Sequence, residues 1–207
     1  MTTIRELFVT RLYEGSIAGA PDFPDFRQEL EAACAMLANE DRAGQAWCKA
    51  NGYSGYTSYA SLDDLPRRAT VFALLKRRLD RHAAIAAQRF DFDLGAGRLN
   101  LDSLWVSILR PGAGHSGHLH PQSVLSGVIY VSAPRGAGAL RFEDPRLTSM
   151  MAAPPRRKDA PEAGRTFVSI TPGDGALLIW ESWLRHEVLP GSGRAPRISI
   201  SFNYAWR

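Results

Sequence analysis

The first 97 residues show patterns of apolar positions that predict one strand and two helices. Residues 4–13 mix β-branched, aromatic and charged residues, which is typical of a strand. Residues 22–37 open with Asp-Phe-Pro-Asp, the composition of a helix start, and then place apolar residues at helical spacing. Residues 44–65 are rich in Gly, Ser, Asn and Tyr and predict a loop with short extended pieces. A second helix is expected after Pro66, with an apolar stripe of Val71, Leu74, Leu75, Leu79, Ala83, Ala86 and Phe90.

From about residue 98 the pattern changes to short β-rich runs separated by Gly, Pro and Ser. The runs are Leu99 to Leu109, Val124 to Val131, Gly138 to Phe142, Arg165 to Thr171, Ala176 to Trp180, His186 to Leu189 and Arg197 to Tyr204. Several short strands with turns between them predict a β-sandwich or barrel. Helices that precede such a unit are expected to pack on its outside. We therefore predict a single domain over residues 1–207, with a supporting strand and helices in 1–97 and a β core in 98–207.

One segment interrupts the β region. Residues 148–165 (TSMMAAPPRRKDAPEAGR) are rich in Pro, Ala and charge and show no periodicity. Long unstructured insertions in compact domains are usually functional or disordered. Because the segment lies between two expected strands, we predict a mobile loop that acts as a lid over a site.

The composition is typical of an intracellular globular protein. Of the 207 residues 45% are hydrophobic, which is enough to build one sizeable core. The net charge of +4 lies largely in short clusters that suit solvated surfaces, so nucleic acid is not an expected partner. Cys34 and Cys48 form no CxxC motif and fit buried thiols in a reducing compartment. We find neither a secretory signal nor an apolar run long enough to cross a membrane, so we expect a cytoplasmic protein.

Candidate metal ligands lie in the β region, which holds four of the five histidines. Side chains two residues apart in a strand point the same way, so His118 and His120 can bind one metal ion together. His186, at the start of another run, can be a third ligand if the fold brings the two strands together. A His-x-His pair alone is also common as an ordinary exposed pair, so its surroundings must decide.

The last predicted strand carries a polar row that consists of Arg197, Ser199, Ser201 and Asn203, with apolar residues on its other face. Such a row either faces solvent or lines a pocket. Arg197 would suit a carboxylate ligand, because a planar guanidinium can bind both carboxylate oxygens at once.

The order of these motifs resembles that of the 2-oxoglutarate (2OG)/Fe(II)-dependent oxygenases. The His-x-His pair precedes LSGVIYV, GALRFEDPR, PGDGALLIWESWLRHEV and RISISFN, and HxHPxSxLSGVxYV looks like the signature of a bacterial group in that superfamily. The resemblance covers about residues 100–207 and, more faintly, Leu7 to Tyr13. It implies a mainly β (α+β) fold, namely a double-stranded β-helix or jelly roll with the N-terminal helices packed outside.

The resemblance also implies a metal site. His118 and His186 match the two histidine ligands, whereas His120 stands where the superfamily has an acid. Because two histidines and one carboxylate form the usual ferrous site, this is a departure. The site has three histidines, recruits Asp144, or keeps one histidine of the pair, together with His115, beside the metal. We favour three histidines with Asp144 in reserve, although a residue before proline also suits a plain turn.

The cosubstrate site follows from the same resemblance. Arg197 matches the arginine that binds the 5-carboxylate of 2OG, and Ser199 and Tyr130 match residues that support it. The implied protein is a 2OG- and Fe(II)-dependent dioxygenase, a hydroxylase of a small-molecule or peptide substrate that the sequence does not identify. The sequence does not fix the assembly, and a homodimer is the commonest kind.

Two other classes of protein stay open. A cupin-type metalloprotein, either an isomerase or a dioxygenase that does not use 2OG, shares the jelly roll and the His-x-His pair. Cupins usually have a glutamate a few residues after that pair, and residues 121–126 contain none. A non-enzymatic β-sandwich binding protein has no need for His118, His120, His186 and Arg197 in this order.

Overall fold

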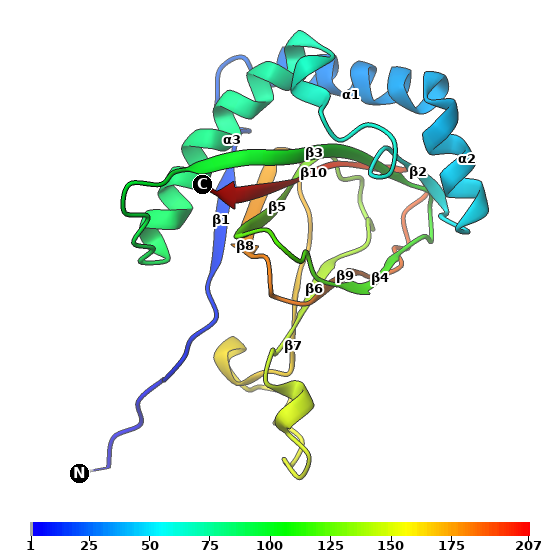
Figure 1. Ribbon diagram of the computed structural model, residues 1–207. Helices are drawn as coiled ribbons and strands as arrows, with labels where there is room; N and C mark the ends of the chain where they lie inside the picture. The colour runs from blue at the N-terminus through cyan, green and yellow to red at the C-terminus, as the bar shows by residue number, and fades with distance from the viewer. Residues whose placement is uncertain (1) are drawn as a thin grey trace.

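The computed structural model describes residues 2–207 and consists of two facing β-sheets with helices on one side (Figure 1). The six-stranded sheet has the order β1-β8-β5-β10-β3-β2, and the four-stranded sheet has the order β4-β9-β6-β7. The helices are α1 (Phe23–Glu40), α2 (Arg42–Ala50) and α3 (Thr70–Arg89). The strands are β1 (Leu12–Ser16), β2 (Gly55–Thr57), β3 (Leu99–Leu109), β4 (His115–His118), β5 (Leu125–Ser132), β6 (Leu140–Glu143), β7 (Phe167–Ile170), β8 (Ala176–Glu181), β9 (His186–Val188) and β10 (Arg197–Trp206).

The chain alternates between the two sheets from β3 to β10, except that β6 and β7 pair within the smaller sheet. All pairs of strands in both sheets are antiparallel. This topology is a double-stranded β-helix, or jelly roll. It confirms the predicted fold class, and Figure 1 shows the helices outside the larger sheet, as expected.

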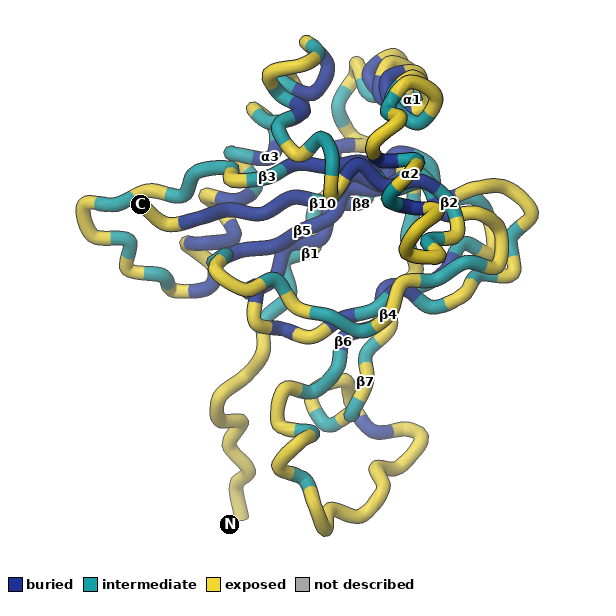
Figure 2. The backbone as a smooth tube through the Cα atoms, turned by 45° about the vertical axis from the view of Figure 1, so that its right-hand side comes forward, coloured by how far each residue is buried: buried dark blue, intermediate teal, exposed yellow. Residues whose placement is uncertain are grey.

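Two apolar layers hold the sheets in place. The first lies between the helices and the larger sheet, where Leu75, Leu79 and Phe202 are fully buried. The second lies between the two sheets and includes Val128, Tyr130 and Trp180. Figure 2 shows long buried stretches of the backbone along β5 and β10. The larger sheet is therefore a rigid support for side chains that point between the sheets.

The β runs expected from the sequence all coincide or overlap with strands, and Leu99–Leu109 agrees at both ends. The predicted first strand is wrong in its position, because β1 begins only at Leu12. Leu12 pairs with Trp180 and β8 ends at Glu181, so earlier residues have no partner strand. Ile4 and Phe8 are each 94% exposed, which shows that β propensity without a partner does not make a strand.

The predicted loop over 44–65 is also wrong at its start, because α2 covers Arg42–Ala50. The Asp41 carboxylate accepts a hydrogen bond from the backbone N–H of Gly44 and caps this helix. Downstream, β2 is the expected short extended piece and pairs with β3. Within α3, Leu74 is exposed, unlike most of the apolar stripe.

The insertion over 148–165 lies at the far end of β6 and β7, below the smaller sheet in Figure 1. It is not wholly irregular, since it includes short 3₁₀ turns at Leu147–Ser149 and Glu162–Gly164. With the segment that precedes β1, it borders an open cavity of about 710 Å³. Of the described helices, none is long and apolar enough to cross a membrane.

Candidate metal centre

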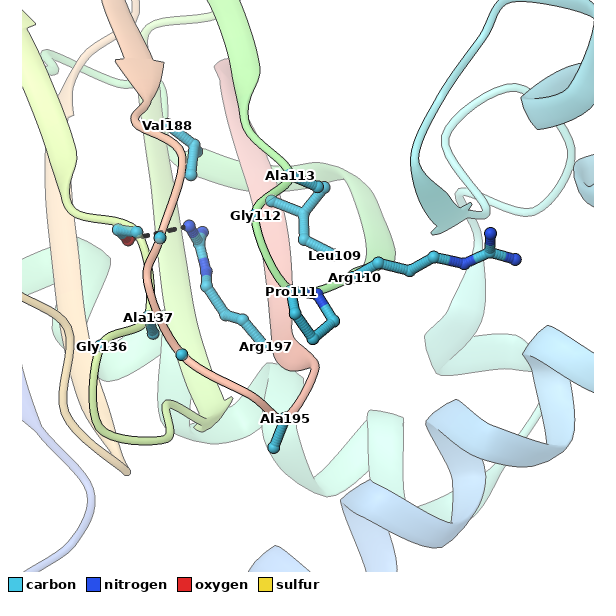
Figure 3. Close-up of a pocket in the computed structure, with 13 residues that line it drawn as sticks. Leu109, Arg110, Pro111, Gly112, Ala113, Gly136, Ala137, Val188, Ala195 and Arg197 are labelled. Atoms are coloured by element: carbon cyan, nitrogen blue, oxygen red, sulfur yellow. Dashed lines mark hydrogen bonds between the residues drawn. The ribbon is translucent and has the colours of Figure 1, made fainter.

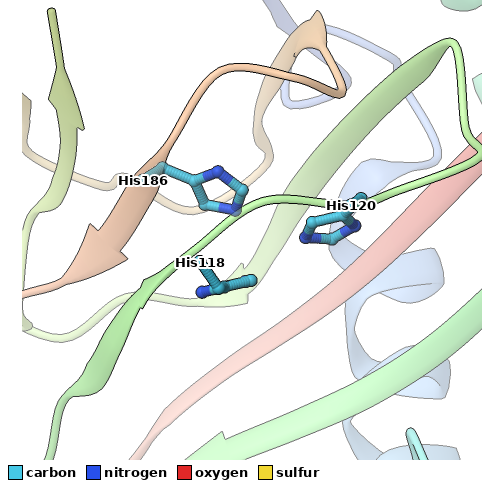
Figure 4. A group of neighbouring side chains, drawn as sticks. All are labelled: His118, His120 and His186. Carbon is cyan, nitrogen blue, oxygen red and sulfur yellow. The ribbon is translucent and has the colours of Figure 1, made fainter. Parts of the chain in front are cut away.

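Three histidines converge between the two sheets, at one end of the smaller one (Figure 4). His118 ends β4 and His186 begins β9, and the two residues are direct partners in the antiparallel register. One ring nitrogen from each of His118, His120 and His186 lies within 4.8 Å of the others. The fold therefore joins the histidines that the sequence analysis singled out.

His120 reaches this cluster by a different route from the expected one. β4 ends at His118, so the alternation of side chains along a strand does not place His120. Instead, its backbone N–H donates to the carbonyl oxygen of Ser182 at 3.0 Å. The centre of the His120 ring then lies 5.1 Å from the ring centres of both His118 and His186.

Hydrogen bonds fix which ring nitrogen of each histidine carries the proton. The Nδ1 atom of His118 lies 2.8 Å from the carbonyl oxygen of Ser116, and that of His186 lies 2.9 Å from the carbonyl oxygen of Leu184. A carbonyl oxygen only accepts, so Nδ1 donates in both cases and Nε2 keeps a free lone pair. The Nε2 atom of His120 is buried and has no hydrogen-bond partner within residues 2–207.

All three histidines are neutral near pH 7. Burial, followed by the neighbouring His118, lowers the pKa of His186 to about 3. Burial likewise lowers the pKa of His120 to about 4 and that of His118 below its ordinary value. Neutral imidazoles with free Nε2 lone pairs are metal ligands, so the donor set fits a divalent transition-metal ion.

A buried arginine lies on the same side of the larger sheet as the histidines. Arg197 is only 6% exposed and begins β10 (Figure 3). Its guanidinium has long contacts to the carbonyl oxygen of Gly138 at 3.4 Å and to Oγ of Ser199 at 3.5 Å. Among the described residues no carboxylate pairs with it, and its Nε has no partner. Because a buried unpaired cation is costly, this arrangement favours an anionic ligand.

The hydroxyl group of Tyr130 is the third part of this arrangement. Tyr130 is fully buried, and its hydroxyl finds no hydrogen-bond partner in the described part of the chain. Burial raises its pKa above the ordinary value, so the group is a protonated donor. The histidines, Arg197 and Ser199 line one cavity between the sheets, so a metal ion and an anion can bind side by side.

The sequence from residue 103 to 203 matches a family model described as "Putative 2OG-Fe(II) oxygenase". By this match, residues 103–203 belong to the 2OG-Fe(II) oxygenase family. The matched segment contains the three histidines and Arg197. No curated protein matches the chain.

Solved structures that resemble this oxygenase have low sequence identity to it. A prolyl-4-hydroxylase from Pseudomonas putida is 16% identical, with 96% of this chain and 94% of that chain covered and a TM-score of 0.57. HygX from Streptomyces hygroscopicus, with nickel, 2-oxoglutarate and hygromycin B bound, is 15% identical, with 95% and 83% covered and a TM-score of 0.60. An oxidoreductase of the 2OG-Fe(II) oxygenase family from Burkholderia pseudomallei is 17% identical; the match spans 66% of this chain but only 56% of that chain, with a TM-score of 0.48. At such identities the likeness to the prolyl-4-hydroxylase and to HygX shows the fold alone.

Asp144, the reserve ligand, lies elsewhere in the oxygenase. Its carboxylate accepts hydrogen bonds from Arg146 at 2.8 and 3.0 Å and borders the cavity beside the insertion. In the described chain no carboxylate joins the three-histidine cluster. The ring of His115 stacks on that of His118, with 4.5 Å between the ring centres, but contributes no nitrogen to the cluster.

Two further residues belong to the site. Trp180 lines the histidine cavity, and its buried indole N–H has no acceptor within the described residues. Asn203 belongs to the polar row of the last strand, and its Oδ1 lies 2.7 Å from Nδ1 of His120. The polar row was the available signal for Asn203, whereas no sequence signal distinguishes Trp180 from an ordinary core tryptophan.

Proposed function

We propose that the protein is a 2OG- and Fe(II)-dependent dioxygenase that hydroxylates a C–H bond of a small molecule or a peptide. His118, His120 and His186 would hold the metal through Nε2. One observation carries the proposal: three neutral histidines converge in the same cavity as a buried arginine that lacks a carboxylate partner. The chain of HygX, which has the same fold, has nickel and 2-oxoglutarate bound, and this supports the assignment.

Arg197, Ser199 and Tyr130 would bind the far carboxylate of 2OG. The guanidinium provides charge and a pair of donors, and the two hydroxyls can donate further hydrogen bonds. The apolar layer between the sheets excludes water from this end of the cavity, which strengthens each of these interactions. The cosubstrate is thereby oriented with its 2-oxo acid end directed away from Arg197.

The histidines fix the charge of the centre. Three neutral ligands leave the full charge of a divalent ion in place, whereas a carboxylate ligand would cancel part of it. A doubly negative cosubstrate is therefore attracted more strongly than at a site with one carboxylate. The bound ion and 2OG supply the oxidising chemistry, in which 2OG, O₂ and substrate give succinate, CO₂ and the hydroxylated product.

Finer features of the function are part of the same proposal. Cys34 and Cys48 are buried free thiols, which supports a cytoplasmic location.

The insertion over 148–165 would act as a lid, and bound metal and 2OG should then slow limited proteolysis within it. Unchanged cleavage in this segment would count against a lid. A homodimer stays a prediction.

Succinate formation tests the function directly. The protein is prepared anaerobically with Fe(II), then supplied with 2OG and O₂, and succinate is measured. We expect turnover that requires Fe(II), and loss of most of it in His186→Ala and in Arg197→Ala. Arg194→Ala is the matched control, because Arg194 is an exposed arginine three residues before Arg197.

The alternatives give different results in this assay. A cupin-type enzyme would bind metal through the histidines but would not respond to 2OG or to Arg197→Ala. A binding protein would show neither metal-dependent 2OG binding nor turnover. Either result would overturn the proposal.

A further inference from the structure

We propose that Asn203 is the residue that positions His120 as a metal ligand. The inference rests on the proposed function, since it concerns the same metal site. His120 needs such a partner because it lies beyond the end of β4, whereas His118 and His186 are held within paired strands. The backbone bond from His120 to Ser182 places the residue but leaves its ring free to turn.

The side chain of Asn203 constrains that ring. Its Oδ1 lies 2.7 Å from Nδ1 of His120, and Asn203 itself is buried, with only 8% of its surface exposed. An amide oxygen only accepts, so the contact requires Nδ1–H and directs the Nε2 lone pair away from Asn203, towards the cluster. This bond fixes both the tautomer and the rotation of the ring.

Neighbouring hydroxyl groups decide which end of the amide faces His120. The hydroxyl of Ser126 donates to Oδ1 of Asn203 at 2.8 Å, and Nδ2 of Asn203 donates to Oγ of Ser103 at 3.1 Å. The hydroxyls of Ser126 and Ser182 are 2.8 Å apart. Ser182 is also the residue whose carbonyl oxygen accepts the hydrogen bond from the backbone N–H of His120, so the side-chain and backbone contacts of His120 belong to one network. With the amide turned over, Nδ2 would face His120, and Ser126 would lose its acceptor.

This arrangement suits a site in which histidine replaces the usual acid. His118 and His186 donate to backbone carbonyls, but His120 has a side chain from β10 as its partner. A neutral amide keeps the centre free of added negative charge. β10 also carries Arg197, so one strand holds the proposed anion site at its start and the partner of His120 near its end.

Zn(II) affinity of the metal-free protein tests the inference without relying on turnover. Competition with a chromophoric chelator gives the dissociation constant. We expect Asn203→Ala to weaken Zn(II) binding about 10- to 100-fold, as is usual when a hydrogen-bond partner of a metal-bound histidine is lost. Asn203→Asp keeps an acceptor at the same place and should recover most of the affinity. Asn100→Ala is the control, because Asn100 pairs with Ala205 on the same strand as Asn203, but within the described chain its side chain bonds only the Arg98 carbonyl.

A spectroscopic signature separates positioning from general support of the fold. In the Zn(II)-loaded protein, ¹H–¹⁵N spectra should show a slowly exchanging Nδ1 proton for His120. That signal should be lost in Asn203→Ala and kept in Asn203→Asp. Equal Zn(II) affinity and an unchanged His120 signal in Asn203→Ala would overturn the inference while leaving the proposed function intact.

A second variant covers the case in which Asn203→Ala does not fold. Ser103→Ala combined with Ser126→Ala retains Asn203 but removes both bonds that orient its amide. We expect a several-fold loss of Zn(II) affinity in this variant, and wild-type affinity would overturn the inference. If the wild-type protein binds neither Zn(II) nor Fe(II), the proposed function fails and the inference fails with it.

Discussion

The guanidinium carbon of Arg197 lies 4.9 Å from the centre of the Tyr130 ring. The ring supports the cation from one side, and the Tyr130 hydroxyl has no partner of its own in the described chain. We therefore expect Tyr130→Phe to weaken 2OG binding by about 1.5 kcal/mol, or roughly tenfold in Kd, because a donor to a charged ligand is lost. Calorimetric titration of the metal-loaded protein with 2OG measures the change.

Tyr204→Phe is the matched control for this prediction. Tyr204 is also a buried tyrosine, but its hydroxyl donates to Asp80 on α3 rather than towards the site. Its replacement should affect stability more than 2OG affinity. Equal Kd values for wild type and Tyr130→Phe would show that the phenol does not contact the cosubstrate.

Trp180 contributes a second unpaired donor to the same cavity. Its ring meets that of His186 edge to face, with 4.6 Å between the ring centres. Trp180→Phe keeps an aromatic ring but removes the N–H. If that N–H donates to the ligand in the cavity, 2OG affinity should fall by about 1 kcal/mol, or roughly fivefold. Trp206→Phe serves as the control, since that indole donates to the Leu94 carbonyl at the protein surface; a similar loss in both variants would refute the assignment.

Most strands from β3 onward, together with α1 and α3, were predictable because their signals are local. Alternation, turn residues and helical spacing are read within a few residues, and Leu99–Leu109 shows how well this works. The pairing of His118 with His186 is a long-range property. No local pattern encodes this pairing. The expectation came from the order of the motifs along the chain, which resembles that of the 2OG/Fe(II)-dependent oxygenases.

The errors in the sequence analysis arise where an element depends on contacts with distant residues and not on local pattern alone. Residues 4–11 have the composition of a strand but no partner beyond the end of β8. α2 was missed because a helix of nine residues has few apolar positions and is stabilised by contacts with its surroundings. Asp41 provides such contacts, since its carboxylate accepts hydrogen bonds from Gly44, Tyr56 and Ser61.

Asp41→Ala should destabilise the protein for this reason. The loss of the helix cap alone is worth about 0.5–2 kcal/mol, and the Tyr56 and Ser61 hydroxyls lose their acceptor as well. Urea unfolding monitored by circular dichroism measures the free energy of unfolding. Asp25→Ala is a control in the first turn of α1, where no hydrogen bond of this kind is involved. A free energy of unfolding within 0.3 kcal/mol of wild type, roughly the uncertainty of such measurements, would contradict the role of Asp41.

The depressed pKa values of the histidines make the stability of the metal-free protein depend on pH. The unfolded chain binds protons at these histidines near pH 6.5, whereas the folded protein resists protonation down to about 4 at His120 and about 3 at His186. Between pH 6.5 and 5 the unfolded state therefore holds more protons, and acidification favours it. Each such histidine contributes a slope of at most about 1.4 kcal/mol per pH unit.

Urea unfolding of the metal-free protein at several pH values between about 8 and 5 tests this expectation. We expect the free energy of unfolding to be level above pH 7 and to fall on acidification below 6.5. The double variant His120→Gln with His186→Gln removes both groups. Its free energy of unfolding should therefore fall less steeply with pH, by up to twice the slope that one histidine contributes. This comparison of slopes does not depend on the absolute stability of the variant. Parallel curves for the variant and the wild type would mean that these histidines titrate alike in the folded and unfolded states, and hence that burial does not keep them in the neutral, metal-binding form.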